Sequence, residues 1–245
     1  IIIALDVSSS MLAQDIKPNR LERAKYKIMD LLNMLEGDRV GLVAFAGTSY
    51  LQCPLTLDYS ATRIFLNAID TELIPVPGTA IGHAIRTSVK AFNTQDTRSR
   101  AIILITDGED HTGDAIQSAN WAKEHETKIF AIGIGNRIGA PIPSSEPGVS
   151  GFKKDKDGEV ILTKLDEPTL QQMALQTGGA YVRSVTGDMD LQKLYLENIK
   201  HKVESKEIKT ERKRVWEERF QWMIFAALLC LTVKYSRKTS SQKNN

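Results

Sequence analysis

Apolar runs alternate with helical patterns of apolar residues along positions 1–204 of the chain. Several of these runs lack polar alternation, which favours strands buried on both faces of a parallel sheet. The runs predict strands at Ile1–Asp6, Arg39–Ala46, Tyr50–Leu55, Ala101–Thr106, Lys128–Ile134 and Ala180–Arg183. The helical patterns predict helices at Leu21–Leu35, Tyr59–Ile69, Thr79–Phe92, Asp114–Glu124, Glu167–Thr177 and Asp190–Val203. This alternation predicts a doubly wound, mostly parallel α/β sheet with helices on both faces.

The first predicted helix carries its own start and stop signals. Asn19 stands just before the apolar pattern and is a candidate N-cap, and Gly37 follows the pattern as a candidate stop. These signals support a helix between the first two predicted strands.

The segment 139–165 interrupts the alternation of predicted strands and helices, because it is rich in Pro, Gly and Ser and then carries the turn sequence KDGE. The pair Asp157–Gly158 predicts a hairpin with a type I′ turn. We therefore expect an inserted surface hairpin between the fifth strand and the next helix. It is either a solvent-exposed decoration or a partner-binding element.

The C-terminal part changes character. A densely charged linker or helix at 205–219 precedes the apolar run Phe220–Val233, and a basic tail follows at 236–245. The run is shorter than the about 20 residues that a hydrocarbon core of roughly 30 Å requires. Aromatic Trp222 and Tyr235 and a basic stop are nevertheless typical of a span whose tail stays cytoplasmic. We expect a transmembrane helix at 220–235; the alternative is an amphipathic or core helix.

The chain begins inside a predicted strand, so we expect a preceding segment, with a signal peptide or a membrane span in it. The formal net charge of +2 is too small to indicate a nucleic-acid partner. Cys53 and Cys230 both lie in apolar runs and predict no disulfide, which leaves the redox compartment open.

Two predicted buried strands end in an aspartate at the edge where open α/β sheets bind ligands. Asp6 ends the first strand, and Asp107 follows the fourth. A buried carboxylate is costly unless it is paired or bound to a cation. No Arg or Lys stands beside either residue, so we expect a bound cation.

The donor atoms near these aspartates indicate which cation. Asp6, Ser8, Ser10 and Asp107 supply only hard oxygen atoms, which select Mg²⁺, Mn²⁺ or Ca²⁺ over Zn²⁺. Ser8 and Ser10 alternate, so both hydroxyls can point the same way if the loop is extended. Thr79 stands at the predicted start of a helix, where the alternative role is a routine N-cap.

The motifs DVSSSM, PGTAIGHAI and ITDGED resemble, in order, the D-x-S-x-S motif, the threonine loop and the second aspartate loop of von Willebrand factor A domains. In that family these loops form the metal-ion-dependent adhesion site. The resemblance implies that Ser8, Ser10 and Thr79 bind the metal directly, and that Asp6 and Asp107 bind it directly or through water.

Further segments, among them KPNRLERAK, GDRVGLVAFAG, GEDHTGDA and EERFQW, resemble the aerotolerance (Bat) family, in particular its BatB-like members. The resemblance implies a bacterial inner-membrane protein with a periplasmic von Willebrand A domain. It also implies association with other Bat proteins and a MoxR-type ATPase system, and a role in oxidative-stress tolerance. His83 stands where related sequences usually carry an acidic residue. We expect it to pack or to face solvent near the metal rim, and the alternative is that its imidazole hydrogen-bonds a ligand.

The leading hypothesis is a metal-dependent protein-interaction module, not an enzyme, in which Mg²⁺ binds an acidic side chain of a partner. One alternative is a Mg²⁺-dependent phosphoryl-transfer enzyme with Asp6 as nucleophile. Against it, Ser8 replaces a second aspartate and the chain has no G-x-x-x-x-G-K-S/T loop. His111 is the one histidine that remains a candidate for such chemistry. The other alternative is a scaffold whose metal is purely structural.

Overall fold

The computed structural model describes residues 1–92, 99–144 and 151–184, all within the first of two compact units of the chain, Ile1–Lys206. A six-stranded sheet has the order β3-β2-β1-β4-β5-β8 and is parallel except for β3, which runs antiparallel to β2. The strands are β1 (Ile2–Asp6), β2 (Val40–Phe45), β3 (Ser49–Thr56), β4 (Arg100–Thr106), β5 (Thr127–Gly133) and β8 (Ala180–Arg183).

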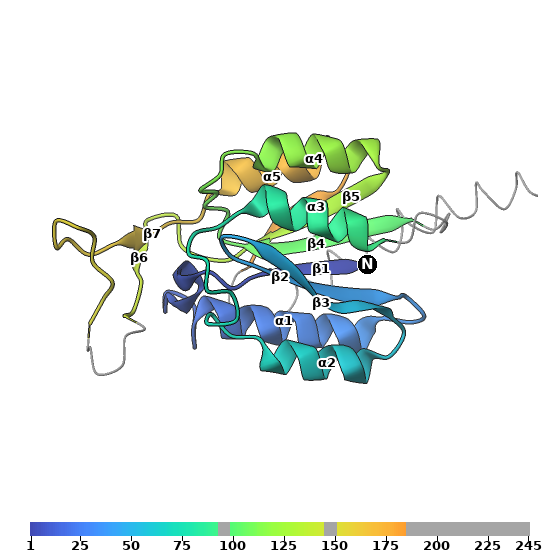
Figure 1. Cartoon of the computed structure of the whole chain (residues 1–245), viewed down its shortest axis with the longest axis horizontal. Coiled ribbons are helices and arrows are strands. Elements are labelled where there is room, and N and C mark those ends of the chain that lie inside the picture. Colours follow the sequence, from blue (N-terminus) through green and yellow to red (C-terminus); the bar gives the residue numbers. More distant parts are fainter. Residues whose placement is uncertain (93–98, 145–150, 185–245) are drawn as a thin grey trace, which may run out of the picture. The chain divides into compact units, whose positions relative to one another are not determined.

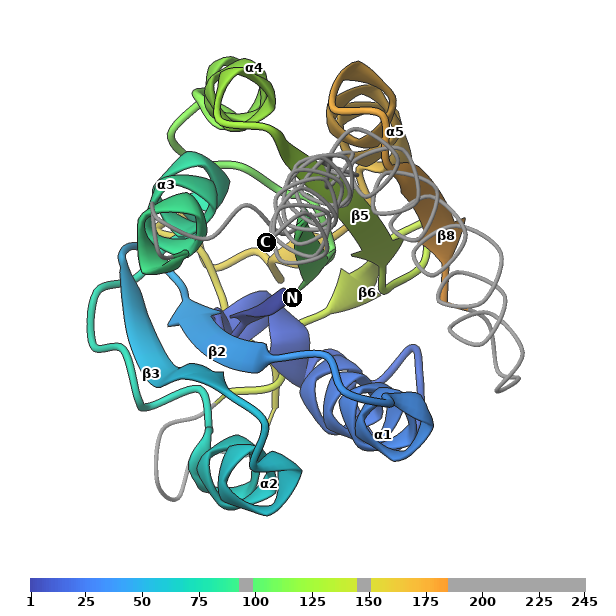
Figure 2. The same ribbon diagram turned by 90° about the vertical axis from the view of Figure 1, so that its right-hand side faces the viewer.

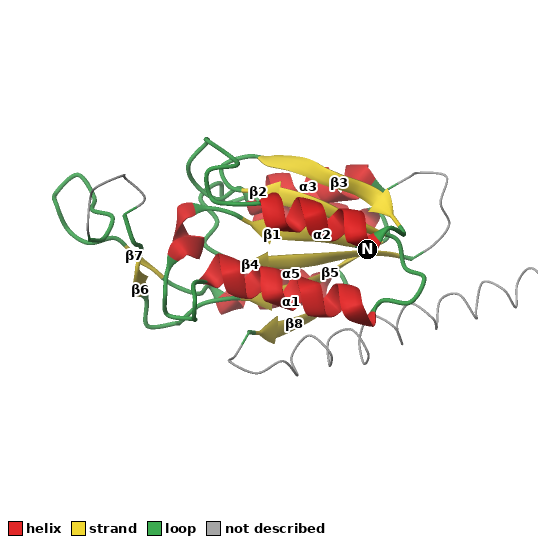
Figure 3. Ribbon diagram, turned by 90° about the horizontal axis from the view of Figure 1, so that it is seen from below, coloured by secondary structure: helices red, strands yellow, loops and turns green. Residues whose placement is uncertain are grey.

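Helices cover both faces of this sheet (Figures 1 and 2). They are α1 (Arg20–Met34), α2 (Tyr59–Ala68), α3 (Ile81–Ala91), α4 (Ala115–Glu124) and α5 (Glu167–Gln176). Helices α1 and α2 pack on one face, where Figure 3 shows them side by side. Helices α3, α4 and α5 pack on the other. The predicted doubly wound architecture is therefore confirmed for the described residues.

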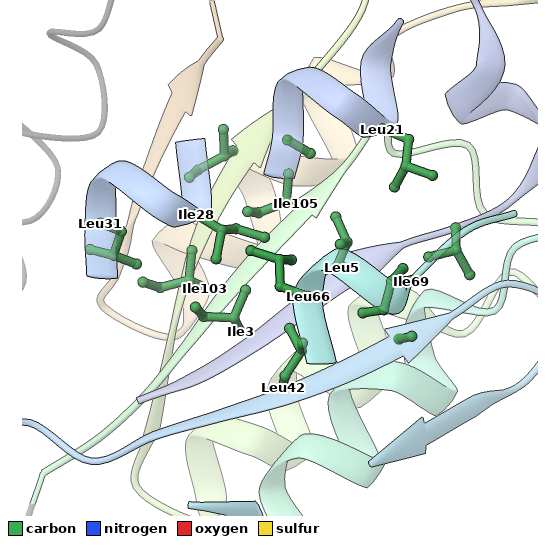
Figure 4. Close-up of a cluster of buried hydrophobic side chains, with 14 of the residues drawn as sticks. Ile3, Leu5, Leu21, Ile28, Leu31, Leu42, Leu66, Ile69, Ile103 and Ile105 are labelled. Atoms are coloured by element: carbon green, nitrogen blue, oxygen red, sulfur yellow. The ribbon is translucent and has the colours of Figure 1, made fainter. Parts of the chain in front are cut away.

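The central strand β1 shows why the fold buries two cores. Successive side chains of a strand point to opposite faces of the sheet. Ile3 and Leu5 therefore join the cluster beneath α1, where Ile28 packs against them (Figure 4). Ile2 and Ala4 join the cluster on the face of α3, α4 and α5. Since both faces are covered, β1 needs apolar residues at every position until it reaches its carboxyl end.

The six predicted strands and five of the predicted helices are confirmed, each with ends within two residues of the prediction. Asn19 caps α1 as expected, because its Oδ1 accepts a hydrogen bond from Glu22 N at 2.8 Å. The predicted helix Asp190–Val203 and the predicted membrane helix 220–235 lie outside the described residues. Among the described helices, none combines the length and the apolar composition that a membrane span requires.

The predicted insertion lies between β5 and α5, where β6 (Ala140–Pro141) pairs antiparallel with β7 (Leu162–Thr163). Its predicted type I′ turn is wrong. A type I′ turn needs a positive φ at both central residues, but Glu126 is the only non-glycine residue with a positive φ in the described part of the chain. The tip closes instead with Gly158 alone at φ 83°, donating to Asp155 O at 3.2 Å. The Asp155 carboxylate stabilises this loop by accepting from the amides of Asp157 and Glu159.

Candidate metal centre

The candidate centre lies at the carboxyl ends of β1 and β4, which pair in parallel with Leu5 opposite Ile105. From this pair the sheet continues through β2 on one side and through β5 on the other. In open α/β sheets, the crevice at such a switch point is where ligands bind. Asp6 and Asp107 leave their strands at this crevice, as predicted, and Figure 1 shows the β6–β7 insertion beyond the same edge.

Asp6 is fully buried, and its carboxylate is held by two local groups. Its Oδ1 accepts a hydrogen bond from Ser8 N at 2.8 Å, and its Oδ2 accepts one from Thr106 Oγ1 at 2.6 Å. Burial, together with the negative charge of Asp107, raises the pKa of Asp6 to about 7. Two carboxylates are thus forced close together in a buried place, which is the electrostatic situation that a bound cation relieves.

Ser8 and Ser10 are both buried, and their Oγ atoms lie 2.9 Å apart. The expectation of an extended loop is wrong, because residues Ser9–Leu12 form a 3₁₀ helix, η1. The two hydroxyls are therefore brought together by this tight turn and not by the alternation of side chains along a strand. The Ser10 side chain also lowers the pKa of Asp107, so the first loop acts on both aspartates.

Thr79 is 2% exposed but does not cap a helix. Helix α3 begins at Ile81 after Ala80, two residues later than predicted, so the N-cap alternative for Thr79 is wrong. The backbone fixes Thr79 at the centre, because its carbonyl accepts from His111 N at 2.9 Å and the next amide, Ala80 N, donates to Ala46 O at 2.7 Å. Thr79 is therefore held between the loops that follow β2 and β4.

Asp107 does have a basic partner, contrary to the sequence-based expectation. Arg20 Nη1 lies 2.9 Å from Asp107 Oδ2, and both side chains are fully buried. The same guanidinium binds Asp15 through Nε–Oδ1 and Nη2–Oδ2 contacts of 2.9 Å each. Burial raises the pKa of Asp107, whereas the hydrogen bond from Ser10 and the charge of Arg20 lower it. Within the described residues, Asp6 has hydrogen bonds but no such ion pair.

The two histidines near this edge take no part in the cluster. His83 is exposed, and its Nδ1 lies 2.6 Å from Ser49 Oγ, which in turn donates to Thr87 Oγ1. His111 is also exposed and contributes its backbone amide to Thr79. Neither ring is in hydrogen-bond contact with Asp6 or Asp107.

Asp110 is a structural residue of the centre that the sequence reasoning missed. Its Oδ1 accepts from Ile81 N at 3.3 Å, and its Oδ2 accepts from Ala115 N at 3.2 Å. One carboxylate therefore serves the first amides of both α3 and α4, and it holds the Thr79 loop against the loop after β4. The sequence signal that could have indicated this role is that Asp110 stands four residues before Asp114, where a helix is predicted to start.

We expect Asp110→Ala to lower the free energy of unfolding by about 1–2 kcal/mol, since a helix cap is worth roughly 0.5–2 kcal/mol and two helices share this one. Asp58→Ala is the matched control, because Asp58 caps only α2, through Ala61 N. Urea unfolding followed by circular dichroism measures both. An Asp110→Ala loss smaller than that of Asp58→Ala would contradict the double cap.

The donor set fits a hard divalent cation. Asp6 and Asp107 supply carboxylates, and Ser8, Ser10 and Thr79 supply hydroxyls, all of them buried at one edge of the sheet. The described ranges contain no group of three or more His, Cys, Asp or Glu side chains that could hold a metal, so a cation here would depend on the serine and threonine hydroxyls as well as on the two carboxylates. Oxygen donors of this kind suit Mg²⁺, Mn²⁺ or Ca²⁺.

Known proteins show the same fold and sequence pattern. The family model for the von Willebrand factor type A domain matches residues 1–109. BatB from Bacteroides thetaiotaomicron is 43% identical, with 78% of this chain and 92% of that chain covered and a TM-score of 0.74. An aerotolerance-related membrane protein from Bacteroides fragilis is 40% identical, with 79% and 94% covered and a TM-score of 0.75.

Among curated sequences, a UPF0353 protein of Mycolicibacterium paratuberculosis is 30% identical over 203 residues, which cover 80% of this chain and 58% of that protein. The chain thus spans little more than half the length of this relative. The two Bacteroides structures, in contrast, are matched over nearly their whole length. The chain therefore belongs to the von Willebrand factor A domain family and, within it, to the BatB-like aerotolerance proteins.

Proposed function

We propose that the chain is a metal-ion-dependent protein-interaction module. A divalent cation held by Asp6, Ser8, Ser10, Thr79 and Asp107 would bind an acidic side chain of a partner protein. The observation that carries the proposal is Asp6, a fully buried carboxylate without an ion pair in the described part of the chain, facing a second buried carboxylate. A cation between them compensates the charge that burial makes costly.

The open coordination shell of the ion favours an acidic partner. Asp6 has no ion pair in the described part of the chain, whereas Arg20 is shared between Asp107 and Asp15. Mg²⁺ takes six oxygen ligands and readily keeps some of them as water, so a carboxylate from outside can complete its shell. Mg²⁺ is the proposed ion, and Mn²⁺ or Ca²⁺ suits the same oxygen set.

The cellular setting is part of the proposal. One similar structure is that of an aerotolerance-related membrane protein, which supports a membrane-anchored role connected with oxidative-stress tolerance. We propose an inner-membrane location with the von Willebrand A domain in the periplasm. The proposed partner is a protein that offers an Asp or Glu to the metal, and we further propose association with other Bat proteins and a MoxR-type ATPase system.

The interaction module is preferred over a phosphoryl-transfer enzyme because Asp107, the carboxyl that lies beside Asp6, is tied to Arg20 by a buried ion pair. The groups that hydrogen-bond Asp6 are the Ser8 amide and the Thr106 hydroxyl, and neither titrates near neutral pH. His83 is engaged with Ser49, and His111 is exposed. Turnover of a generic phosphate ester that Asp6→Asn abolishes would reverse this preference.

We expect the immobilised chain to retain membrane proteins in millimolar Mg²⁺ and to release them in EDTA. Asp6→Asn should retain none of them in either condition, because it removes the carboxylate without a counter-charge. Asp58→Asn is the matched control, since it makes the same change at the start of α2 and keeps an oxygen that can accept the hydrogen bond from Ala61 N.

Quantitative mass spectrometry of the bound fraction measures the difference. Retention that is equal in Mg²⁺, in EDTA and for Asp6→Asn would contradict the proposal. If Asp6→Asn lost cation binding but kept full retention, the purely structural metal would be the better hypothesis.

A further inference from the structure

The β6–β7 insertion, described at 139–144 and 151–165, is joined at its base to the carboxylates of the candidate metal centre. Thr163 Oγ1 lies 3.1 Å from Asp107 Oδ2 and 2.9 Å from Glu109 Oε2. The next amide, Lys164 N, donates to Glu109 Oε1 at 2.8 Å. The loop after β4 therefore contacts the insertion through both Asp107 and Glu109, and Asp107 is the one of the two that would also hold the metal.

Arg20 also connects the insertion to the candidate metal centre, because it contacts both Thr163 and Asp107. Its Nη1 donates to Asp107 Oδ2 at 2.9 Å and to Thr163 Oγ1 at 3.0 Å, and it is fully buried. The guanidinium has little room to move, because a Cβ added to Gly135 would lie 2.8 Å from Arg20 Cζ. Gly135 has a φ of 137°, a conformation that favours glycine, so the backbone packs directly against Arg20.

Thr163 has one hydroxyl proton but two carboxylate acceptors. Since Arg20 Nη1 already donates to its oxygen, the hydroxyl proton can go to Asp107 or to Glu109, but not to both at once. A cation beside Asp107 weakens that carboxylate as an acceptor. The proton then favours Glu109, and this strengthens the bond between the insertion and the β4 loop.

A second contact lies further along the insertion. Lys153 Nζ is 3.1 Å from Ser9 Oγ, in the loop that carries Ser8 and Ser10. Inside the insertion, Ile161 N donates to Lys153 O and Lys153 N donates to Ile142 O, so its three segments are linked to one another. Order at its base is thereby passed on to the rest of the described insertion.

We propose that Arg20 and Thr163 are positioning residues that couple cation binding at Asp107 to the order of the β6–β7 insertion. The insertion is then a wall of the partner-binding surface that becomes fixed when the metal is bound. This inference rests on the proposed function, but its test needs the metal alone and no partner.

Hydrogen exchange of the full chain, in millimolar Mg²⁺ and in EDTA, measures this coupling. We expect peptides within 151–165 to exchange about tenfold more slowly with Mg²⁺, a factor within the usual range of coupling between sites. Peptides of α2 (Tyr59–Ala68), whose side-chain hydrogen bonds reach neither the insertion nor the proposed metal ligands, should not change. Thr163→Val should lose the slowing and, because coupling is reciprocal, bind Mg²⁺ correspondingly more weakly.

Thr87→Val is the matched control, since Thr87 accepts a hydrogen bond from Ser49 outside this cluster, and it should keep the wild-type response. Glu109→Gln is the second variant if Thr163→Val does not fold; it weakens the acceptor for Thr163 and should reduce the slowing. Mg²⁺ binding without slower exchange at 151–165, or full slowing in Thr163→Val, would overturn the coupling alone. Absence of Mg²⁺ binding by the wild type would overturn the proposed function, and the coupling with it.

Discussion

Replacing Arg20 with methionine will lower the free energy of unfolding by about 3–5 kcal/mol, the usual cost of removing one partner from a buried ion pair. The side chain is fully buried and binds Asp107 and Asp15 together. Methionine fills much of the volume but leaves both carboxylates without their cation. Urea unfolding in EDTA measures the loss without any contribution from bound metal.

Arg63→Met is the matched control for this change. Arg63 Nη2 binds Asn33 Oδ1 at 2.7 Å on the exposed surface, so its loss should stay within about 0.5 kcal/mol. The double variant Arg20→Met with Asp15→Asn should recover part of the loss, because it removes one of the two unpaired charges. A loss below about 1 kcal/mol for Arg20→Met would show that the ion pair does not stabilise this edge of the sheet.

The strands and helices that form the layers of the fold could be predicted from the sequence, because the patterns that specify them are local. β1 must be apolar throughout since both its faces are covered, and this is visible as an uninterrupted run. The α1 cap needs only Asn19 and an amide three residues later. The turn errors have a different origin: the 3₁₀ helix after Ser8 and the turn at Gly158 depend on backbone angles that several local sequences can adopt.

In the candidate site, too, the local groupings could be predicted from the sequence and the long-range pairs could not. Asp6, Ser8 and Ser10 lie in one short loop, so their grouping could be predicted, and Asp107 follows a strand whose end was visible in the sequence. The Arg20–Asp107 pair joins residues 87 positions apart, and the Thr163–Asp107 contact joins residues 56 positions apart. No local pattern marks either pair. The sequence therefore predicted a bare carboxylate at Asp107 where the fold supplies a partner.

Asp6→Asn is expected to have the largest effect on cation binding and a small one on the fold. Asparagine keeps an oxygen for Ser8 N and removes the charge that Asp107 repels. Loss of even an outer-shell partner typically weakens metal binding 10–100-fold, so loss of this carboxylate should weaken Mg²⁺ binding by more than about 100-fold. Circular dichroism in EDTA checks that the variant remains folded.

The most direct measurement is thermal unfolding of the wild type, Asp6→Asn and Asp58→Asn across a Mg²⁺ titration from EDTA. A ligand that binds only the folded state stabilises it by about 2.7 kcal/mol at a hundredfold excess over Kd. We expect the wild type and Asp58→Asn to rise together in melting temperature, and Asp6→Asn to stay flat. A flat wild type, or an Asp6→Asn variant that rises as the wild type does, would contradict a metal centre at Asp6.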